Sequence, residues 1–135
     1  MSNVEVKWME GLQFLAQTGS GHGIVLDGPD GAGARPLEML LVGLAGCTAM
    51  DVISILQKKR QHVTDFRVSV SGKRAENHPK IYTDIHIEYH ITGKEISEKA
   101  VERAIELSET AYCSASAMLG KAATITSSYQ ISEAE

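Results

Sequence analysis

The sequence has few aromatic residues, little net charge and only two cysteines. Phenylalanine, tryptophan and tyrosine make up 5% of its 135 residues, and the formal net charge at pH 7 is -4. A chain with neither a basic surplus nor a long acidic tail is a poor candidate for binding nucleic acid. Its composition, 43% hydrophobic and 22% charged, is that of an ordinary globular domain.

The N-terminal segment lacks the pattern of an export signal. In MSNVEVKWMEG no basic region is followed by an apolar stretch and a small-residue cleavage site. We therefore expect a cytoplasmic protein, in which two cysteines are free thiols or a redox couple in preference to a permanent cross-link. The sequence also has no internal repeat, low-complexity segment or linker, and its length predicts a single domain over residues 1–135.

The first third of the sequence predicts three short strands. Apolar and polar residues alternate over residues 4–8 and 12–16, with a tight turn expected at Glu10 and Gly11, so this segment is expected to form a hairpin. A third strand is expected at residues 24–26. The glycine-rich and proline-containing segment 27–34 follows as a loop that matches no phosphate-binding or calcium-binding template.

A long helix is expected next. Pro36 suits a first helical turn, and residues 37–60 contain no proline. Between Met39 and Leu56 the apolar residues surround the helix axis, which indicates burial on most sides. A membrane span is disfavoured because polar residues shorten the run below about 20 residues. One chain of this size cannot cover such a helix, so we expect an obligate homodimer in which a second copy does so.

The second half of the sequence predicts a longer hairpin, a helical segment and a closing strand. The hairpin strands are expected at residues 66–70 and 81–91, and the closing strand at 125–131. Ser97 is expected to cap a helix, and the small residues 114–117 to begin a second helical piece. The expected buried face of the first helix comprises Val101, Ala104, Ile105, Ser108 and Tyr112.

Two groups of residues could carry chemistry. The first is His86, Glu88 and His90 on one face of an expected strand. The two histidines lie roughly 13 Å apart at strand spacing, too far to bind one ion together, and we interpret this face as a solvated polar surface. The second is the pair Cys47 and Cys113 with Glu38. Positions 47 and 113 are far apart in the sequence, which alone cannot show that they meet.

Three segments resemble the OsmC/Ohr family of bacterial hydroperoxide-reducing proteins. The segments PLEMLL (36–41) and GCTAMD (46–51) resemble the family's central helix, and YCSASAML (112–119) resembles its second-cysteine segment. The pattern is most similar to the short OsmC-like branch. The resemblance implies an α+β fold with antiparallel sheets packed around long central helices. It also implies an intertwined homodimer with two active sites at the interface.

The resemblance implies a two-cysteine peroxidase acting on organic hydroperoxides, in an oxidative stress response. Cys47 would be the peroxidatic thiolate, Cys113 the resolving thiol, and an external dithiol the reductant, with no cofactor, metal, nucleic acid or membrane involved. In the family's peroxidases a helix glutamate positions an activating arginine. Here Glu38 is the candidate glutamate; the loop 19–23 contains no arginine, and Arg35 is the nearest one.

Helix geometry limits what Glu38 and Asp51 can do. Glu38 and Cys47 are separated by about 180° around a helix and roughly 13 Å along it. Glu38 can therefore act on the thiol only from a partner chain or across a helix break at Gly43 or Gly46. Otherwise its negative charge stabilises the N-terminal end of the helix through the helix dipole. Asp51 lies one turn beyond Cys47, where its charge would raise the thiol pKa unless it is paired or bonded elsewhere. We interpret Asp51 as structural, satisfying a buried donor.

Two other functions remain open from the sequence. One is a non-enzymatic dimer that binds a small hydrophobic ligand or senses redox state, and the other is a structural dimer with inert buried thiols.

Overall fold

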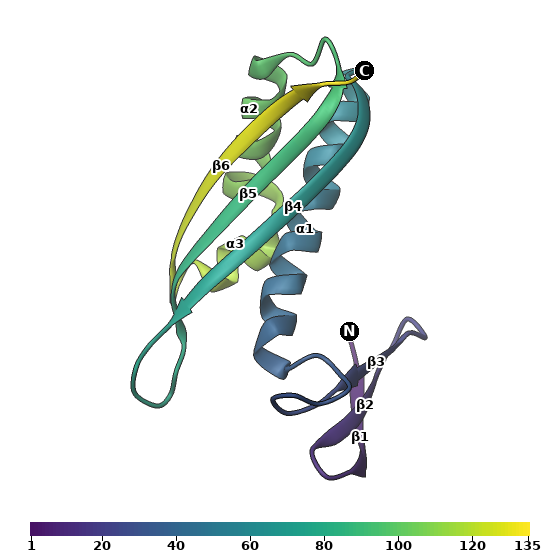
Figure 1. Cartoon of the computed structure of the whole chain (residues 1–135), viewed down its shortest axis with the longest axis vertical. Helices are drawn as coiled ribbons and strands as arrows, with labels where there is room; N and C mark the ends of the chain where they lie inside the picture. The colour runs from purple at the N-terminus through teal and green to yellow at the C-terminus, as the bar shows by residue number, and fades with distance from the viewer. The chain divides into compact units, whose positions relative to one another are not determined.

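The computed structural model describes residues 1–135, which form two compact units, Met1–Leu40 and Leu41–Glu135. The elements follow the expected order of three strands, a long helix, two strands, a helical segment and a strand (Figure 1). The long helix α1 (Pro36–Lys58) begins in the first unit and continues through the second without a break.

The first unit is built on a three-stranded antiparallel sheet. Strands β1 (Val4–Glu10), β2 (Gln13–Thr18) and β3 (Gly23–Leu26) lie in the order β1-β2-β3. The β1–β2 turn contains Gly11 at a φ of 52°, a conformation that favours glycine. The predicted hairpin and short third strand are therefore confirmed.

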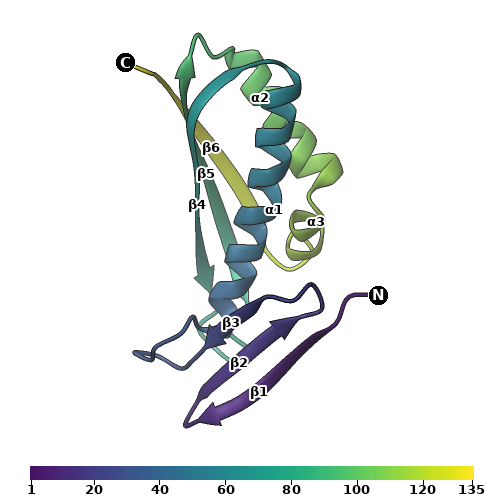
Figure 2. The same ribbon diagram turned by 90° about the vertical axis from the view of Figure 1, so that its right-hand side faces the viewer.

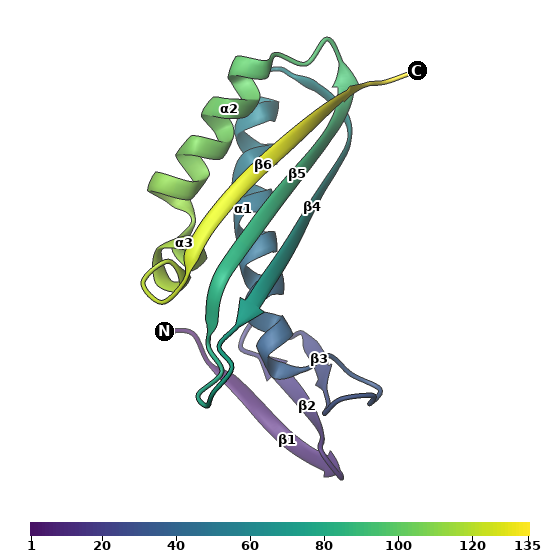
Figure 3. The same ribbon diagram turned by 60° about the vertical axis from the view of Figure 1, so that its left-hand side comes forward.

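The second unit contains a mixed sheet. Strands β4 (His62–Arg74) and β5 (Tyr82–Lys94) pair antiparallel, as the hairpin pattern predicts. Strand β6 (Thr124–Glu133) pairs with β5 in parallel, so the expectation of purely antiparallel sheets is wrong for this pair. The physical reason is the connection, because the helical segment between β5 and β6 carries the chain back to the end where β5 began (Figure 3).

The two faces of β5 differ sharply in burial. Ile85, Ile87, Tyr89 and Ile91 are at most 1% exposed and belong to the core. The intervening side chains, including those of His86 and His90, lie on the opposite face of the strand and are partly or fully exposed. His86 is hydrogen-bonded there to Thr126 and Ser128 of β6. The solvated polar face predicted from the sequence is confirmed.

Helix α1 buries one stripe within the second unit. Figure 2 shows this part of α1 on the same face of the sheet as the later helices, and its buried residues are Leu44, Thr48, Val52 and Leu56. As expected from the sequence, a single chain does not bury α1 on most sides, since Val42 and Met50 are 57% and 73% exposed, and burial by a second copy stays a prediction. Nothing within the second unit covers those side chains.

Helix α1 is long and apolar enough to cross a membrane by length and composition alone. Its mean hydropathy is 2.0 over 18 residues, of which 22% are buried. The sequence argument that the run is too short is therefore too strict. A single such helix is weak evidence for a span, because the core helix of a soluble protein passes the same test. Thr48 and Asp51, on its packed side, form hydrogen bonds to other elements of the unit.

The helical segment after β5 changes its winding before Cys113. Helix α2 (Glu98–Leu107) is capped by Ser97, as predicted, and is followed by a π-helical turn, η1 (Ser108–Tyr112), and by α3 (Ser114–Leu119). The first four residues of the predicted apolar face are buried, but Tyr112 is 62% exposed. A π-turn adds a residue per turn, which rotates Tyr112 out of the face expected for a regular helix.

Candidate functional site

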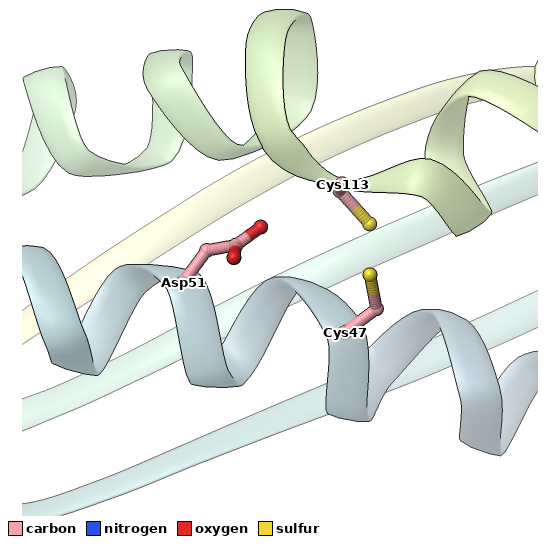
Figure 4. A group of neighbouring side chains, drawn as sticks. All are labelled: Cys47, Asp51 and Cys113. Atoms are coloured by element: carbon pink, nitrogen blue, oxygen red, sulfur yellow. The ribbon is translucent and has the colours of Figure 1, made fainter.

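The structure brings together the two cysteines that lie far apart in the sequence. Cys47 and Asp51 lie one turn apart on α1, and Cys113 follows η1 directly. The two sulfur atoms and a carboxylate oxygen of Asp51 all lie within 4.8 Å of one another. In Figure 4 the sulfur atoms point toward each other across the gap between the helices. Both cysteines are free thiols.

Local backbone contacts hold Cys113 in this position. Its N–H donates to the carbonyl oxygen of Ser108 at 2.7 Å, which closes the π-turn. Its side chain caps α3, because the Ser116 N–H donates to Sγ at 3.4 Å. Cys113 is only 4% exposed, whereas Cys47 is partly exposed. A reagent from solution therefore has better access to Cys47.

The surroundings of Cys113 favour its neutral thiol. Burial raises its pKa above the ordinary value, Ser116 acts in the opposite direction, and the neighbouring Cys47 raises the pKa further. A buried thiol that stays protonated at neutral pH is a weak first nucleophile. Cys47 is accordingly the better candidate for the initial attack on a substrate, and Cys113 is the better candidate for the resolving thiol.

A chain of hydrogen bonds through three buried hydroxyl groups begins beside the thiols. The Ser108 hydroxyl donates to Asp51 at 3.0 Å and lies 2.8 Å from the Thr48 hydroxyl. Thr48 lies 2.8 Å from the hydroxyl of Tyr89, which donates to Glu109 at 2.9 Å. Ser108, Thr48 and Tyr89 are all fully buried. We call these three side chains the hydroxyl chain.

Most members of this hydrogen-bonded series were not identified from the sequence. From the sequence, Asp51 was expected to accept a hydrogen bond from a buried donor. The buried Ser108 hydroxyl, in the same polypeptide, is such a donor. Thr48, Tyr89 and Glu109 were not singled out. The available signal was that Thr48, Tyr89 and Ser108 occupy core-facing positions of three elements, where a hydroxyl group needs a partner.

Glu38 lies in the first unit, in contact with Arg35. The carboxylate accepts a hydrogen bond from the Arg35 side chain and forms a salt bridge with it at 2.9 Å, and it also accepts from the Arg35 backbone N–H. The hydrogen bonds and charge of Arg35 lower the pKa of Glu38. Because α1 does not break at Gly43 or Gly46, a helix break cannot bring Glu38 to Cys47 of the same chain. A contribution from a partner chain, or a role at the helix N-terminus, remains.

Metal binding and thiol redox chemistry compete for the same atoms. Cys47, Asp51 and Cys113 are the one set of three such side chains close enough to share an ion, and neither His86 nor His90 belongs to such a set. A thiol pair that cycles through a disulfide needs its sulfur atoms uncoordinated. The expectation of no metal and no cofactor stays a prediction.

This is an α+β protein with a thiol pair: a long helix packs against a mixed sheet, one cysteine lies on that helix, and the other lies between η1 and α3. The chain belongs to the OsmC-like protein family, whose model matches residues 28–128. The resemblance recognised in the sequence is thereby confirmed.

Individual relatives extend over nearly the whole chain. Protein YhfA of Escherichia coli K12 is 46% identical over 127 residues, covering 93% of this chain and 95% of YhfA. A crystal structure of a protein from Aquifex aeolicus is 37% identical, with a TM-score of 0.91, covering 100% of this chain and 98% of the other. The organic hydroperoxide resistance protein OsmC of Legionella pneumophila shares the fold, with a TM-score of 0.71, at 15% identity and 96% coverage of both chains.

Proposed function

We propose that this protein is a thiol-dependent peroxidase that reduces organic hydroperoxides through Cys47 and Cys113. The observation that carries the proposal is the approach of the two sulfur atoms to within 4.8 Å, with both cysteines free. A small movement brings such a pair to disulfide distance. The distant likeness in fold to an organic hydroperoxide resistance protein supports the substrate class.

The reaction proceeds in two balanced steps. The Cys47 thiolate attacks one peroxide oxygen, the S–O bond forms, the O–O bond breaks, and the departing alkoxide takes a proton to become an alcohol. The Cys113 sulfur then attacks the sulfenic sulfur, forming the S–S bond. Hydroxide leaves with the Cys113 proton as water. A dithiol reductant of the cytoplasm regenerates both thiols by exchange.

A second copy of the chain is part of this proposal. The side chains of Val42 and Met50 project from α1 into solvent, and Gly43 and Gly46 between them leave open space. An apolar helix surface of this kind is suited to packing against its own symmetry mate. The salt-bridged side chains of Arg35 and Glu38 are 57% and 47% exposed. In the dimer of this proposal, the pair is therefore free to contact the Cys47–Cys113 site of the second copy.

We expect Val42→Asp to dissociate the dimer. A carboxylate buried without a partner costs on the order of 3–5 kcal/mol, a factor of a hundred or more in Kd. Sedimentation velocity at micromolar concentration should change from a dimer of 14.6 kDa chains to a monomer. The control is Lys99→Glu, which places a charge of the same sign on an exposed position of α2. A monomeric wild type, or equal dissociation of the control, would refute the dimer.

The function itself is tested by titrating the reduced protein with cumene hydroperoxide. We expect the loss of two thiols per chain at one equivalent, and slower loss with hydrogen peroxide, because the proposed substrates are organic hydroperoxides. Free thiols are counted with a chromogenic disulfide under denaturing conditions. Full retention of both thiols after excess cumene hydroperoxide excludes the peroxidase.

One observation favours the alternative of a ligand-binding dimer. The first unit contains a pocket of about 320 Å³ whose lining is largely apolar, formed by Val6, Leu12, Phe14, Leu26, Asp27, Gly28 and Pro36. Apolar pockets of this size accept small hydrophobic molecules. Retained thiols in the titration, together with a lipid-like molecule in native mass spectra of the purified protein, would favour this function.

A further inference from the structure

The hydroxyl chain connects two carboxyl groups that form no salt bridge within the polypeptide chain. Asp51 lies at one end, beside the thiols, and Glu109 lies at the other. The structure contains two salt bridges, Arg35–Glu38 and Arg103–Glu106, and neither involves these carboxyl groups. The two thiol sulfur atoms lie within 4.8 Å of an Asp51 carboxylate oxygen, and Asp51 is connected to Tyr89 and Glu109 through the hydroxyl chain.

The number of protons in this chain does not match the number of hydrogen bonds. Four oxygen–oxygen links join Asp51 to Glu109, but the three hydroxyl groups supply only three protons. If both carboxyl groups are ionised, Ser108 donates to Asp51 and Tyr89 donates to Glu109. Thr48 can then fill only one of its two links, although both measure 2.8 Å. The other link would have lone pairs facing each other at hydrogen-bond distance.

One additional proton removes the mismatch. When it resides on Asp51, every link donates toward Glu109, and when it resides on Glu109, every link donates toward Asp51. Burial raises the pKa of Tyr89 far above its ordinary range, so its hydroxyl keeps the proton that either arrangement needs. Reversing the three hydroxyl groups exchanges the two arrangements, which moves a proton equivalent across the core without moving a heavy atom far.

The far end of the chain opens toward solvent. Glu109 lines a pocket of about 380 Å³ together with Ser116 and Gly120. Its second carboxylate oxygen accepts a hydrogen bond from the exposed Ser127 at 3.2 Å. A proton that reaches Glu109 can therefore exchange with water.

We propose that Asp51, Ser108, Thr48, Tyr89 and Glu109 form a proton relay that carries protons between the Cys47 thiol and the pocket at Glu109. Asp51 accepts the thiol proton, directly after a side-chain rotation or through one bridging water, since the atoms lie within 4.8 Å. The same transfer leaves the thiolate beside a neutral carboxylic acid. Glu109 releases its own proton to water in the pocket as the three hydroxyl groups reverse, so the negative charge of the relay resides on Glu109 and two anions are not paired at the thiol.

The use of this relay in peroxide reduction rests on the proposed function. There, the proton that Asp51 accepts from Cys47 is returned to the alkoxide that leaves when the O–O bond breaks. Glu109 then takes up a proton from water in the pocket, which restores the shared proton, so no further acid, base or reductant is needed for that step. Proton transfer from Cys47 itself can be observed without any peroxide.

The test is the pH dependence of Cys47 alkylation by iodoacetamide, with modification assigned to Cys47 by peptide mass spectrometry. Thr48→Val keeps the side-chain shape and removes the central hydroxyl group, which leaves Asp51 as an anion beside the sulfur. We expect the alkylation midpoint to rise by about one pH unit and the rate at pH 7 to fall about tenfold. Thr48→Ser retains the hydroxyl group and should keep the wild-type profile.

Two results would overturn the relay. One is an unchanged profile in folded Thr48→Val, and the other is an equal shift in Thr48→Ser. If Thr48→Val does not fold, the infrared spectrum of the wild type decides. A protonated carboxyl band at neutral pH that is lost in Glu109→Gln supports the shared proton, and its absence from the wild type refutes it. A shifted alkylation profile without any consumption of cumene hydroperoxide would retain the relay and reject the peroxidase.

Discussion

Cys47→Ser should abolish the reduction of cumene hydroperoxide. The partly exposed Cys47 is the sulfur that a substrate can reach, whereas Cys113 is 4% exposed and its raised pKa keeps it protonated. The serine hydroxyl is a far weaker nucleophile than a cysteine thiolate at neutral pH. We expect turnover with an added dithiol to fall by roughly three orders of magnitude or more, to the uncatalysed background.

The result is measured as dithiol-dependent loss of hydroperoxide. Thermal unfolding should show that Cys47→Ser remains folded, since the substitution is nearly isosteric at a position that is not fully buried. Exposed Ser114, next to the second cysteine, offers a matched control in Ser114→Ala, which should retain activity. Substantial turnover by Cys47→Ser would show that the reaction does not begin at this sulfur.

Cys113→Ser should separate the two steps of the cycle. Cys47 can still be oxidised, because the first step uses only its own sulfur. The sulfenic acid then has no partner within 4.8 Å, so it persists instead of condensing to a disulfide. We expect one equivalent of alcohol per chain in the first turnover and at least a tenfold fall in steady-state rate with the dithiol reductant.

Dimedone labelling detects the trapped species. Labelled Cys47 should accumulate in Cys113→Ser after one equivalent of cumene hydroperoxide, and the wild type should show little label because its sulfenic acid is consumed. Equal labelling of both proteins would mean that Cys113 does not resolve the intermediate, even though the two sulfur atoms lie close together.

The sequence predicted the elements of the fold well because their signals are local. Alternation in β5 and the serine cap of α2 depend on neighbouring residues, and both appear in the structure. The parallel pairing of β5 with β6 was missed because it depends on the path of the whole helical segment between them. The exposure of Tyr112 was missed because a π-turn leaves no clear trace in apolar periodicity.

The candidate site was predictable only in part. The family motifs pointed to Cys47 and Cys113, but their approach is a tertiary contact that spacing cannot show. The connection from Asp51 to Glu109 passes through α1, η1 and β5, and each of its three hydroxyl groups belongs to a residue without a sequence signature of its own. Polar residues at core-facing positions are the general signal for such networks, because burial obliges each of them to find a partner.

The central claim is that Cys47 and Cys113 form one redox pair. It is tested most directly by treating the reduced protein with one equivalent of cumene hydroperoxide, blocking the remaining thiols and measuring intact and peptide masses. The account predicts a chain lighter by two hydrogen atoms, with the Cys47 and Cys113 peptides joined by an intramolecular disulfide. A chain whose mass is raised by two blocking groups, on Cys47 and Cys113, or a disulfide formed only between chains, would contradict it.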